Sequence, residues 1–231
     1  ALAVLGRSDR ALALLDDATN DAAKHDIAPG WWVPVQLAAP RIEVLARRGD
    51  GTALRQLANE LRGRSQREGA LHPDADQVHL AEGLADLFAG DGPAATRSLR
   101  QAARSARAGS GSAIAAGFAE CRLVGALVLA GDVDAARTVL QEVHRSVPQE
   151  ALRGELALAR AWVAESGGLA EADEVGEDRA AALSVLHLCW RREPDGPAST
   201  DLASQILRVA DGIDGPWAVA ISNQVRGWLE G

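Results

Sequence analysis

The sequence predicts an all-α protein in which helical hairpins stack in a row, an α-solenoid with a period of about 41 residues. Three observations support this prediction. The 231 residues are 47% hydrophobic but only 3% aromatic, so alanine, leucine and valine make up most of the apolar content. Alanine and leucine favour helices, whereas the aromatic residues that favour strands are scarce. A glycine recurs at a nearly constant interval, and an apolar stripe with helical spacing follows each copy.

A Gly-Asp pair marks the repeated unit. It occurs at Gly49-Asp50, Gly90-Asp91 and Gly131-Asp132, and Gly6 begins a similar run. Internal periods of this length are typical of stacked helical arrays. In all four units the residues five, nine and twelve positions after the glycine are apolar, and they share one face of a helix. They are Ala11, Leu15, Ala18, Leu54, Ala58, Leu61, Ala95, Leu99, Ala102, Ala136, Leu140 and Val143.

The glycine and the aspartate each have a physical role at a helix end. A helix that stops commonly places a residue with positive φ just beyond its last turn, and glycine adopts that conformation at little cost. The carboxylate behind it accepts hydrogen bonds from the free N–H groups at the start of the next helix. Each unit is therefore expected to be a helix, a tight turn and a second helix. A lone hairpin cannot bury its apolar stripe, so the units must stack.

Turn and cap residues separate the expected helices. Pro40 lies inside one of them and predicts a kink. The glycine-rich run 108–117 predicts a turn between helices with a serine cap. Up to residue 166 the expected helices span residues 8–24, 34–48, 53–67, 74–89, 93–107, 111–130, 133–146 and 149–166.

The repeat weakens after residue 166. An acidic run follows at 171–178, and helices are expected again at 178–192, 199–211 and 216–229. We therefore divide the chain into helical repeats at 1–166 and divergent repeats, or a C-terminal cap of the same array, at 167–231.

The repeated pattern resembles the second half of a tetratricopeptide repeat. Pro148 stands where that repeat usually has its helix-ending proline, and Gly83 falls on its early glycine. The period exceeds the 34 residues usual for that family, and Asp86 occupies a position that is aromatic there. Longer, divergent repeats of this kind resemble the sensor region of the large LuxR-type, maltose-activator-like regulators of high-GC bacteria. The resemblance covers residues 1–166.

The resemblance implies a function. In those regulators a signal-transduction ATPase precedes the helical-repeat sensor and a helix-turn-helix follows it. The chain is then expected to be a non-enzymatic sensor region that binds a small-molecule inducer or a protein partner in its concave groove, with self-association as a further option. The alternative is a free-standing tetratricopeptide-like scaffold that binds a peptide or a partner protein.

Charge and composition argue against other classes. A net charge of −8 and a pI of about 5.2 lack the basic footprint of nucleic-acid binding, so no direct contact with nucleic acid is expected. The N-terminus shows no signal-peptide pattern. The longest apolar run, 113–130, is interrupted by Glu120 and Arg122 and is too short for a membrane span. Cys121 and Cys189 are expected to be buried thiols, which favours a cytoplasmic protein.

The chain contains no methionine and no tyrosine. Because an initiator methionine is missing and the helical pattern runs from residue 1, we expect this sequence to be part of a longer protein.

Candidate binding residues are two tryptophans and a row of arginines. By family resemblance, Trp31 and Trp32 begin a helix of the type that lines the inner groove. Adjacent residues cannot face the same way, so one is expected in the core, while the other lines the groove or packs on a neighbouring hairpin. A basic stripe is expected to be either a solvated face or a contact for an acidic partner or ligand. It consists of Arg97, Arg100, Arg104 and Arg107.

The sequence predicts no cofactor, metal or catalytic site. No Walker-type phosphate loop and no nucleophile elbow is present. Four potential metal ligands lie in one short segment, His72, Asp74, Asp76 and His79, but without the spacing of a zinc motif. We interpret that segment as a helix start with carboxylates near its positive end. Trp162 and Trp190 are expected in the core.

Overall fold

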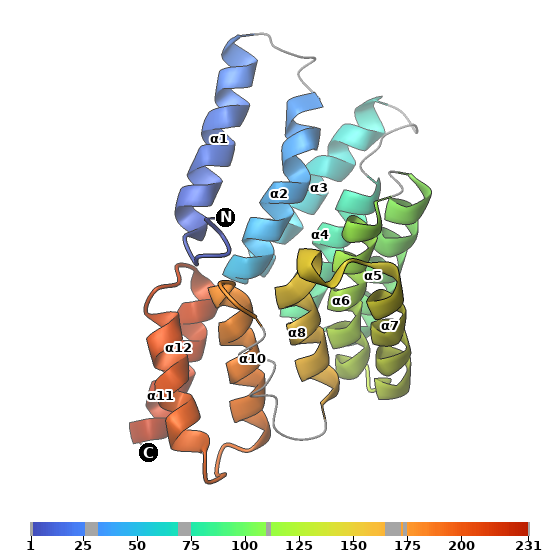
Figure 1. The fold of residues 1–231 in the computed structure, drawn as a ribbon. Coiled ribbons are helices and arrows are strands. Elements are labelled where there is room, and N and C mark those ends of the chain that lie inside the picture. The colour runs from blue at the N-terminus through green and yellow to red at the C-terminus, as the bar shows by residue number, and fades with distance from the viewer. Residues whose placement is uncertain are drawn as a thin grey trace.

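The computed structural model describes residues 2–25, 32–68, 75–109, 112–164, 172 and 175–230. These residues form helices and no strand (Figure 1), so the predicted all-α class is confirmed for them. The helices are α1 (Ser8–Lys24), α2 (Trp32–Arg48), α3 (Gly51–Glu68), α4 (Ala75–Phe88), α5 (Gly92–Ala108), α6 (Ala113–Leu129), α7 (Val133–Ser146), η1 (Gln149–Leu152), α8 (Arg153–Val163), α10 (Arg179–Arg192), α11 (Ser199–Ala210) and α12 (Pro216–Glu230).

The predicted helix at 149–166 differs most from the structure. It begins as the single 3-10 turn η1, whose last residue, Leu152, has φ −125° and ψ 25° and is the N-cap of α8. Pro148 precedes η1 as its N-cap and cannot donate a backbone hydrogen bond there. α2 continues through Pro40. Ser112 caps α6, as predicted, by accepting a hydrogen bond from the backbone N–H of Ala115 at 3.2 Å.

The Gly-Asp pairs lie at helix ends and perform both predicted roles. Gly49, Gly90 and Gly131 have φ between 70° and 84°. The N–H of the following aspartate donates to the carbonyl five residues back, the long hydrogen bond of a Schellman turn. The same aspartate then accepts a side-chain hydrogen bond, at 2.9 to 3.1 Å, from the N–H three residues ahead. One dipeptide therefore closes one helix and begins the next.

Successive helices pack against one another, and every second helix forms an inner layer. Contacts join α2 to α4, α4 to α6, α6 to α8 and α8 to α10, in addition to the contacts between neighbours in the chain. We call α3, α5 and α7 the outer helices, and each packs against the two inner helices that flank it in the chain.

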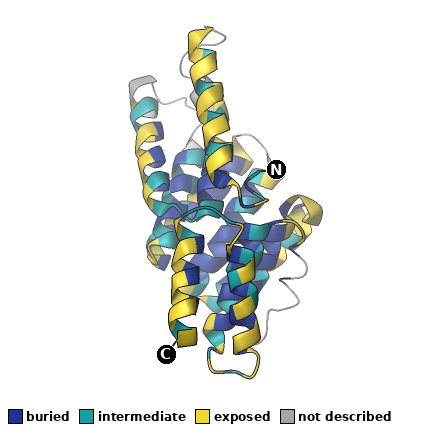
Figure 2. Cartoon of the chain, turned by 90° about the vertical axis from the view of Figure 1, so that its left-hand side faces the viewer, coloured by how far each residue is buried: buried dark blue, intermediate teal, exposed yellow. Residues whose placement is uncertain are grey.

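The repeated apolar stripe forms the core between these layers. All nine stripe residues of the second, third and fourth units are buried. In the first unit Ala11 and Leu15 are half-buried and Ala18 is exposed. The difference follows from position, because α1 packs mainly on α2, and much of its surface faces solvent (Figure 2).

The N-terminal turn packs against the turn before α12. Asp214 donates its backbone N–H to the carbonyl of Gly6 at 2.9 Å. The carboxylate of Asp214 accepts hydrogen bonds from the N–H groups of Ser8 and Asp9, at 2.7 and 2.9 Å, and so caps α1. The N–H of Arg179 donates to the carbonyl of Val4. The first repeat is therefore held against the last hairpins.

Alanine substitutions at three glycines separate backbone strain from crowding. Gly90→Ala should lower the free energy of unfolding by about 1 kcal/mol, because φ is positive there while the space is open. Gly49→Ala should cost more, since the new Cβ would also overlap the side chain of Trp217. Gly63→Ala, inside α3 with nothing nearby, should stabilise by about 1 kcal/mol. Urea unfolding followed by circular dichroism measures all three, and equal losses at Gly49 and Gly90 would contradict the packing of Gly49 on α12.

Candidate functional site

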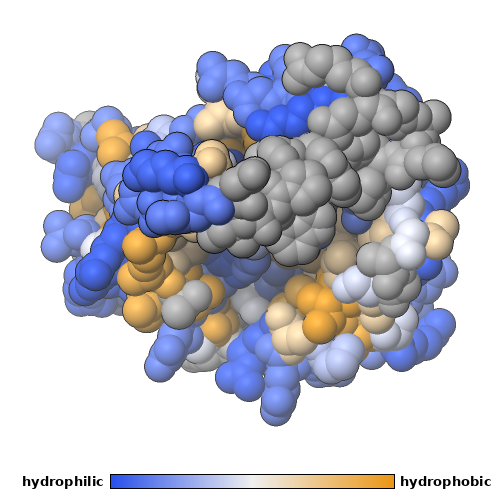
Figure 3. Space-filling view, turned by 90° about the horizontal axis from the view of Figure 1, so that it is seen from above, coloured by the Kyte–Doolittle hydropathy of each residue, from blue (hydrophilic) through white to orange (hydrophobic). Residues whose placement is uncertain are grey.

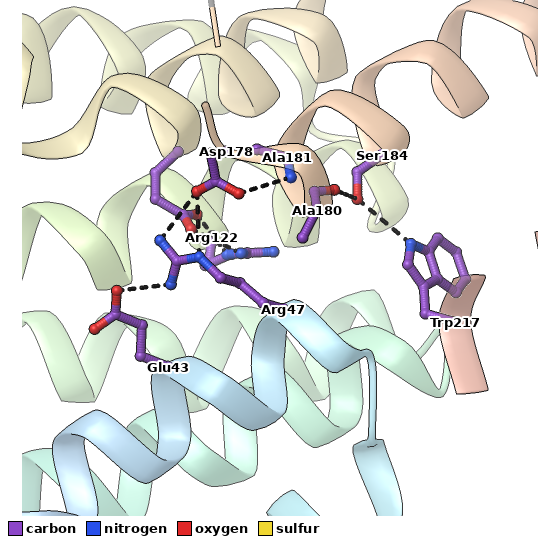
Figure 4. Close-up of polar contacts among 9 residues, drawn as sticks. Glu43, Arg47, Arg122, Asp178, Ala180, Ala181, Ser184 and Trp217 are labelled. Carbon is purple, nitrogen blue, oxygen red and sulfur yellow. Dashed lines mark hydrogen bonds and ion pairs between the residues drawn. The ribbon is translucent and has the colours of Figure 1, made fainter. Parts of the chain in front are cut away.

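Four charged side chains from distant parts of the chain meet inside the inner layer of helices. Arg122 in α6 and Glu155 in α8 form a two-pronged ion pair, with Nη2 to Oε1 at 2.9 Å and Nε to Oε2 at 2.7 Å. Arg47 in α2 contacts Asp178 through Nε at 3.2 Å and Nη2 at 3.1 Å (Figure 4). The side chains of all four are about nine-tenths buried.

Arg47 is held in its charged form by the carboxylates around it. Burial by itself lowers the pKa of this guanidinium, but Glu155, Asp178 and Glu43 together outweigh that effect and raise its pKa above the usual value. Glu43, one turn earlier in α2, accepts a hydrogen bond from Nη1 of Arg47 at 2.7 Å. Arg47 therefore links α2 to Asp178, at the start of α10.

Asp178 serves two elements at once. Its Oδ1 accepts a hydrogen bond from the N–H of Ala181 at 3.1 Å and caps α10, while its Oδ2 contacts Arg47. Gly154 in α8 makes this approach possible, because a Cβ there would lie 3.0 Å from Oδ2 of Asp178. The start of α10 is thus fixed to both α2 and α8.

A cavity of about 250 Å³ borders this cluster of charges. Its lining comes from α2, α4, α6, α8, α10 and α12, so it lies among the inner helices and the last helix of the chain. We call it cavity 1. Its apolar wall consists mainly of Leu87, Phe88, Leu129, Leu158, Trp162, Leu188 and Trp217. Leu129 is 42% exposed, which places it where the cavity meets solvent.

Two of the three polar side chains that α10 contributes to cavity 1, Ser184 and His187, have hydrogen-bond partners within the protein. Ser184 donates to the carbonyl of Ala180 at 3.0 Å and accepts from Nε1 of Trp217 at 3.4 Å (Figure 4). His187 lies edge-on to Trp217, with 5.6 Å between ring centroids, and its Nε2 is 3.0 Å from Oε1 of Gln224. Burial lowers the pKa of His187, so the neutral ring is favoured in the folded protein.

A second cavity, of about 550 Å³, lies on the other side of the charged cluster. We call it cavity 2. Ile114 and Phe118 of α6 line it together with Pro40 of α2, and Glu150 and Glu177 add negative charge. Figure 3 views the molecule from above, where apolar side chains gather on either side of a hollow and hydrophilic ones surround them. Arg47, Glu155 and Asp178 line both cavities and so form a wall between them.

The structure places the predicted arginine stripe away from these cavities. Trp31 and the side chain of Trp32 lie outside the described residues, so their predicted role stays a prediction. Within the described part of the chain, none of the four stripe arginines is among the residues that line either cavity. All four are exposed on the outer helix α5, where Arg107 pairs with Glu120 at 2.5 Å; the others are Arg97, Arg100 and Arg104.

The remaining predicted residues are placed as follows. Cys121 and Cys189 are buried, as predicted, and burial raises the pKa of the Cys121 thiol. Trp190 is buried in the core, whereas Trp162 is only half-buried and lines cavity 1 beside Gly125. Trp162 packs against the buried core, as predicted, but it is not fully buried, because the missing side chain of Gly125 leaves room for its ring at the cavity wall.

The structure describes two of the four potential metal ligands, Asp76 and His79. His72 and Asp74 lie outside the described residues. His79 contacts Glu82 at 3.5 Å, and within the described ranges no three potential ligands gather into a metal site.

The charged cluster was not found from the sequence. Glu120 and Arg122 stood out only as interruptions of an apolar run, and Glu155, Arg47 and Asp178 belong to segments with ordinary helical patterns. A charged residue at an otherwise apolar helical position is the one signal available, and it indicates burial with a partner without identifying that partner.

In comparisons with protein families, with curated proteins and with solved structures, nothing matches this chain. Among the described helices, none combines the length and the apolar character that a bilayer span requires.

Loss of the Arg47 side-chain charge should destabilise the fold strongly. Arg47→Met leaves Asp178 buried without its counter-charge, which costs about 3–5 kcal/mol in the free energy of unfolding. Arg55→Met is the matched control, because Arg55 pairs with Asp86 but is 45% exposed, and such pairs contribute about 1 kcal/mol or less. Urea unfolding compares the two. Equal losses would show that the Arg47 pair is not desolvated.

Acidification should weaken the fold through His187. Its pKa is lowered below the ordinary value of 6.5, so the stability it contributes is complete above that pH and is lost as the pH falls through the lowered pKa. His187→Leu keeps an apolar side chain against Trp190 and Trp217 and removes the titratable group. The free energy of unfolding of the variant should therefore fall less than that of the parent between pH 7 and pH 5. Parallel curves would contradict a buried neutral imidazole.

Proposed function

We propose that this chain is a non-enzymatic sensor domain that binds a small apolar molecule in cavity 1. The observation that carries the proposal is the composition of that cavity, a mostly apolar wall with a few charged and polar groups at one side. Binding sites for small molecules have this character, and they are found between packed helices. Ser184 and His187 hydrogen-bond to other partners rather than to each other, which favours binding over a nucleophile–base pair.

The chain is proposed to form a tetratricopeptide-like superhelix of stacked hairpins. Support comes from the Gly-Asp turns at one period and from the inner layer of alternate helices. In such an array the inner helices face the concave side, and cavity 1 is lined mainly by these helices. The concave groove predicted for such an array is then narrower, because the turn before α12 and the start of α10 hydrogen-bond to the N-terminal turn.

A ligand in cavity 1 would act on the packing of the last helix against α2. Ala46 and Arg47 come from α2, Trp217 comes from α12, and all three line the cavity. A bound molecule therefore touches both helices and favours the arrangement in which they are together. A sensor requires such a preference, since a ligand that binds two states equally shifts neither.

The regulatory role rests on the resemblance to LuxR-type, maltose-activator-like regulators. In that role ligand binding would bias a neighbouring ATPase and a DNA-reading segment between resting and active assemblies. The alternative remains a free-standing scaffold for a peptide or partner protein. A phosphate-binding loop upstream and a helix-turn-helix downstream in the same reading frame distinguish the regulator from the scaffold.

Blocking cavity 1 should abolish binding of a small apolar probe. We expect 3-phenylpropanol to raise the melting temperature of the parent protein, because a ligand of the folded state stabilises it by mass action. Leu188→Trp places a larger side chain in the cavity wall and should remove that shift. Leu14→Trp is the control, since Leu14 is 54% exposed on α1, away from the cavity. A shift that survives in Leu188→Trp, or none in the parent, would contradict the proposal.

A further inference from the structure

The polar groups of cavity 1 are almost all used within the protein. Arg122 is paired with Glu155, and Arg47 with Asp178. Ser184 donates its hydroxyl proton to a backbone carbonyl, and His187 hydrogen-bonds to Gln224. A ligand that competed for these groups would leave buried partners unsatisfied, at a cost of about 1–3 kcal/mol each. The interior of the cavity therefore favours a ligand body without polar atoms.

Arg191 is the exception among the polar residues that line cavity 1. It stands one turn after His187 in α10, it is exposed, and no described residue forms an ion pair with it. The charges of the lining are thus three arginines against two carboxylates, since Glu155 and Asp178 neutralise only Arg47 and Arg122. The unneutralised charge is positive, and it lies where the cavity meets solvent.

The size and the wall of the cavity restrict the ligand body. An apolar cavity of about 150 Å³ is large enough to hold benzene. Cavity 1, at about 250 Å³, has room for one aromatic ring with a short chain. Trp162, Trp217 and Phe88 supply aromatic faces and edges against which a ring packs favourably.

We propose that the ligand of cavity 1 is a small aromatic carboxylate, with its ring among the tryptophans and its carboxylate on Arg191. This inference rests on the proposed function and specifies its ligand class. An arginine binds a carboxylate through paired hydrogen bonds. Because Arg191 is exposed, the attraction is modest and falls as the salt concentration rises.

Three probes of one shape test the inference: 3-phenylpropanoate, 3-phenylpropanol and 3-phenylpropylamine. Calorimetry on the complete chain at low salt should give about fivefold tighter binding of the carboxylate than of the alcohol, and weaker binding of the amine. Arg191→Gln should reduce the preference for the carboxylate to less than twofold, while Arg191→Lys should retain most of it. Arg208→Gln, at another exposed arginine in α11, is the matched control and should leave the preference unchanged.

Each result decides between the two proposals. Equal binding of the three probes, or a preference for the amine, overturns the carboxylate inference and leaves cavity 1 as an apolar site. A preference that persists in Arg191→Gln also overturns it, because another group would then supply the charge. If no probe binds while the parent remains folded by circular dichroism, the proposed function fails together with the inference.

Discussion

The stacking of the helices depends on reversing the direction of the chain within two or three residues, at Gly49-Asp50, Gly90-Asp91 and Gly131-Asp132. Each Gly-Asp pair closes one helix through a long backbone hydrogen bond and caps the next through a carboxylate, so neither helix end is left with all its polar groups unpaired. Tight reversals hold neighbouring helices side by side. Their apolar stripes are then buried by the adjoining hairpin, and the inner helices are brought close enough to enclose a cavity.

The charged residues that separate the two cavities cost desolvation free energy, and helix packing alone does not require them. Burying four ions is unfavourable unless each finds a close counter-charge, and apolar side chains of the same size often stabilise a fold as well or better. Arg47 and Asp178, 131 residues apart in the chain, nevertheless join α2 to the start of α10. A wrong register of α10 against α2 would leave Asp178 buried without its counter-charge and Arg47 with Glu43 alone. The wall therefore favours one arrangement of the last hairpins over others of similar apolar burial.

Much of the fold could be predicted from the sequence because its signals are local. Helix ends followed from glycine, proline and capping residues within a few positions, and the stripe at Leu54, Ala58 and Leu61 identified the buried face. The site could not be predicted in this way. Trp217 and Arg47 share a cavity only because the chain curves until its ends meet, and no pattern within one helix encodes that contact. The arginine stripe was conspicuous because it is regular, yet regular spacing on an outer helix indicates only a shared face.

The cap that Asp214 places on α1 has a consequence for how the molecule comes apart. In a linear array each unit touches only its neighbours, so the terminal units fray first and separately. Here the first helix takes its N-terminal hydrogen bonds from a residue more than 200 positions away. The amide protons of Ser8 and Asp9 should therefore exchange with solvent only when the turn at Asp214 detaches from α1. Contacts between such distant residues also form late and slow the search for the native state, because the whole intervening chain must first be ordered.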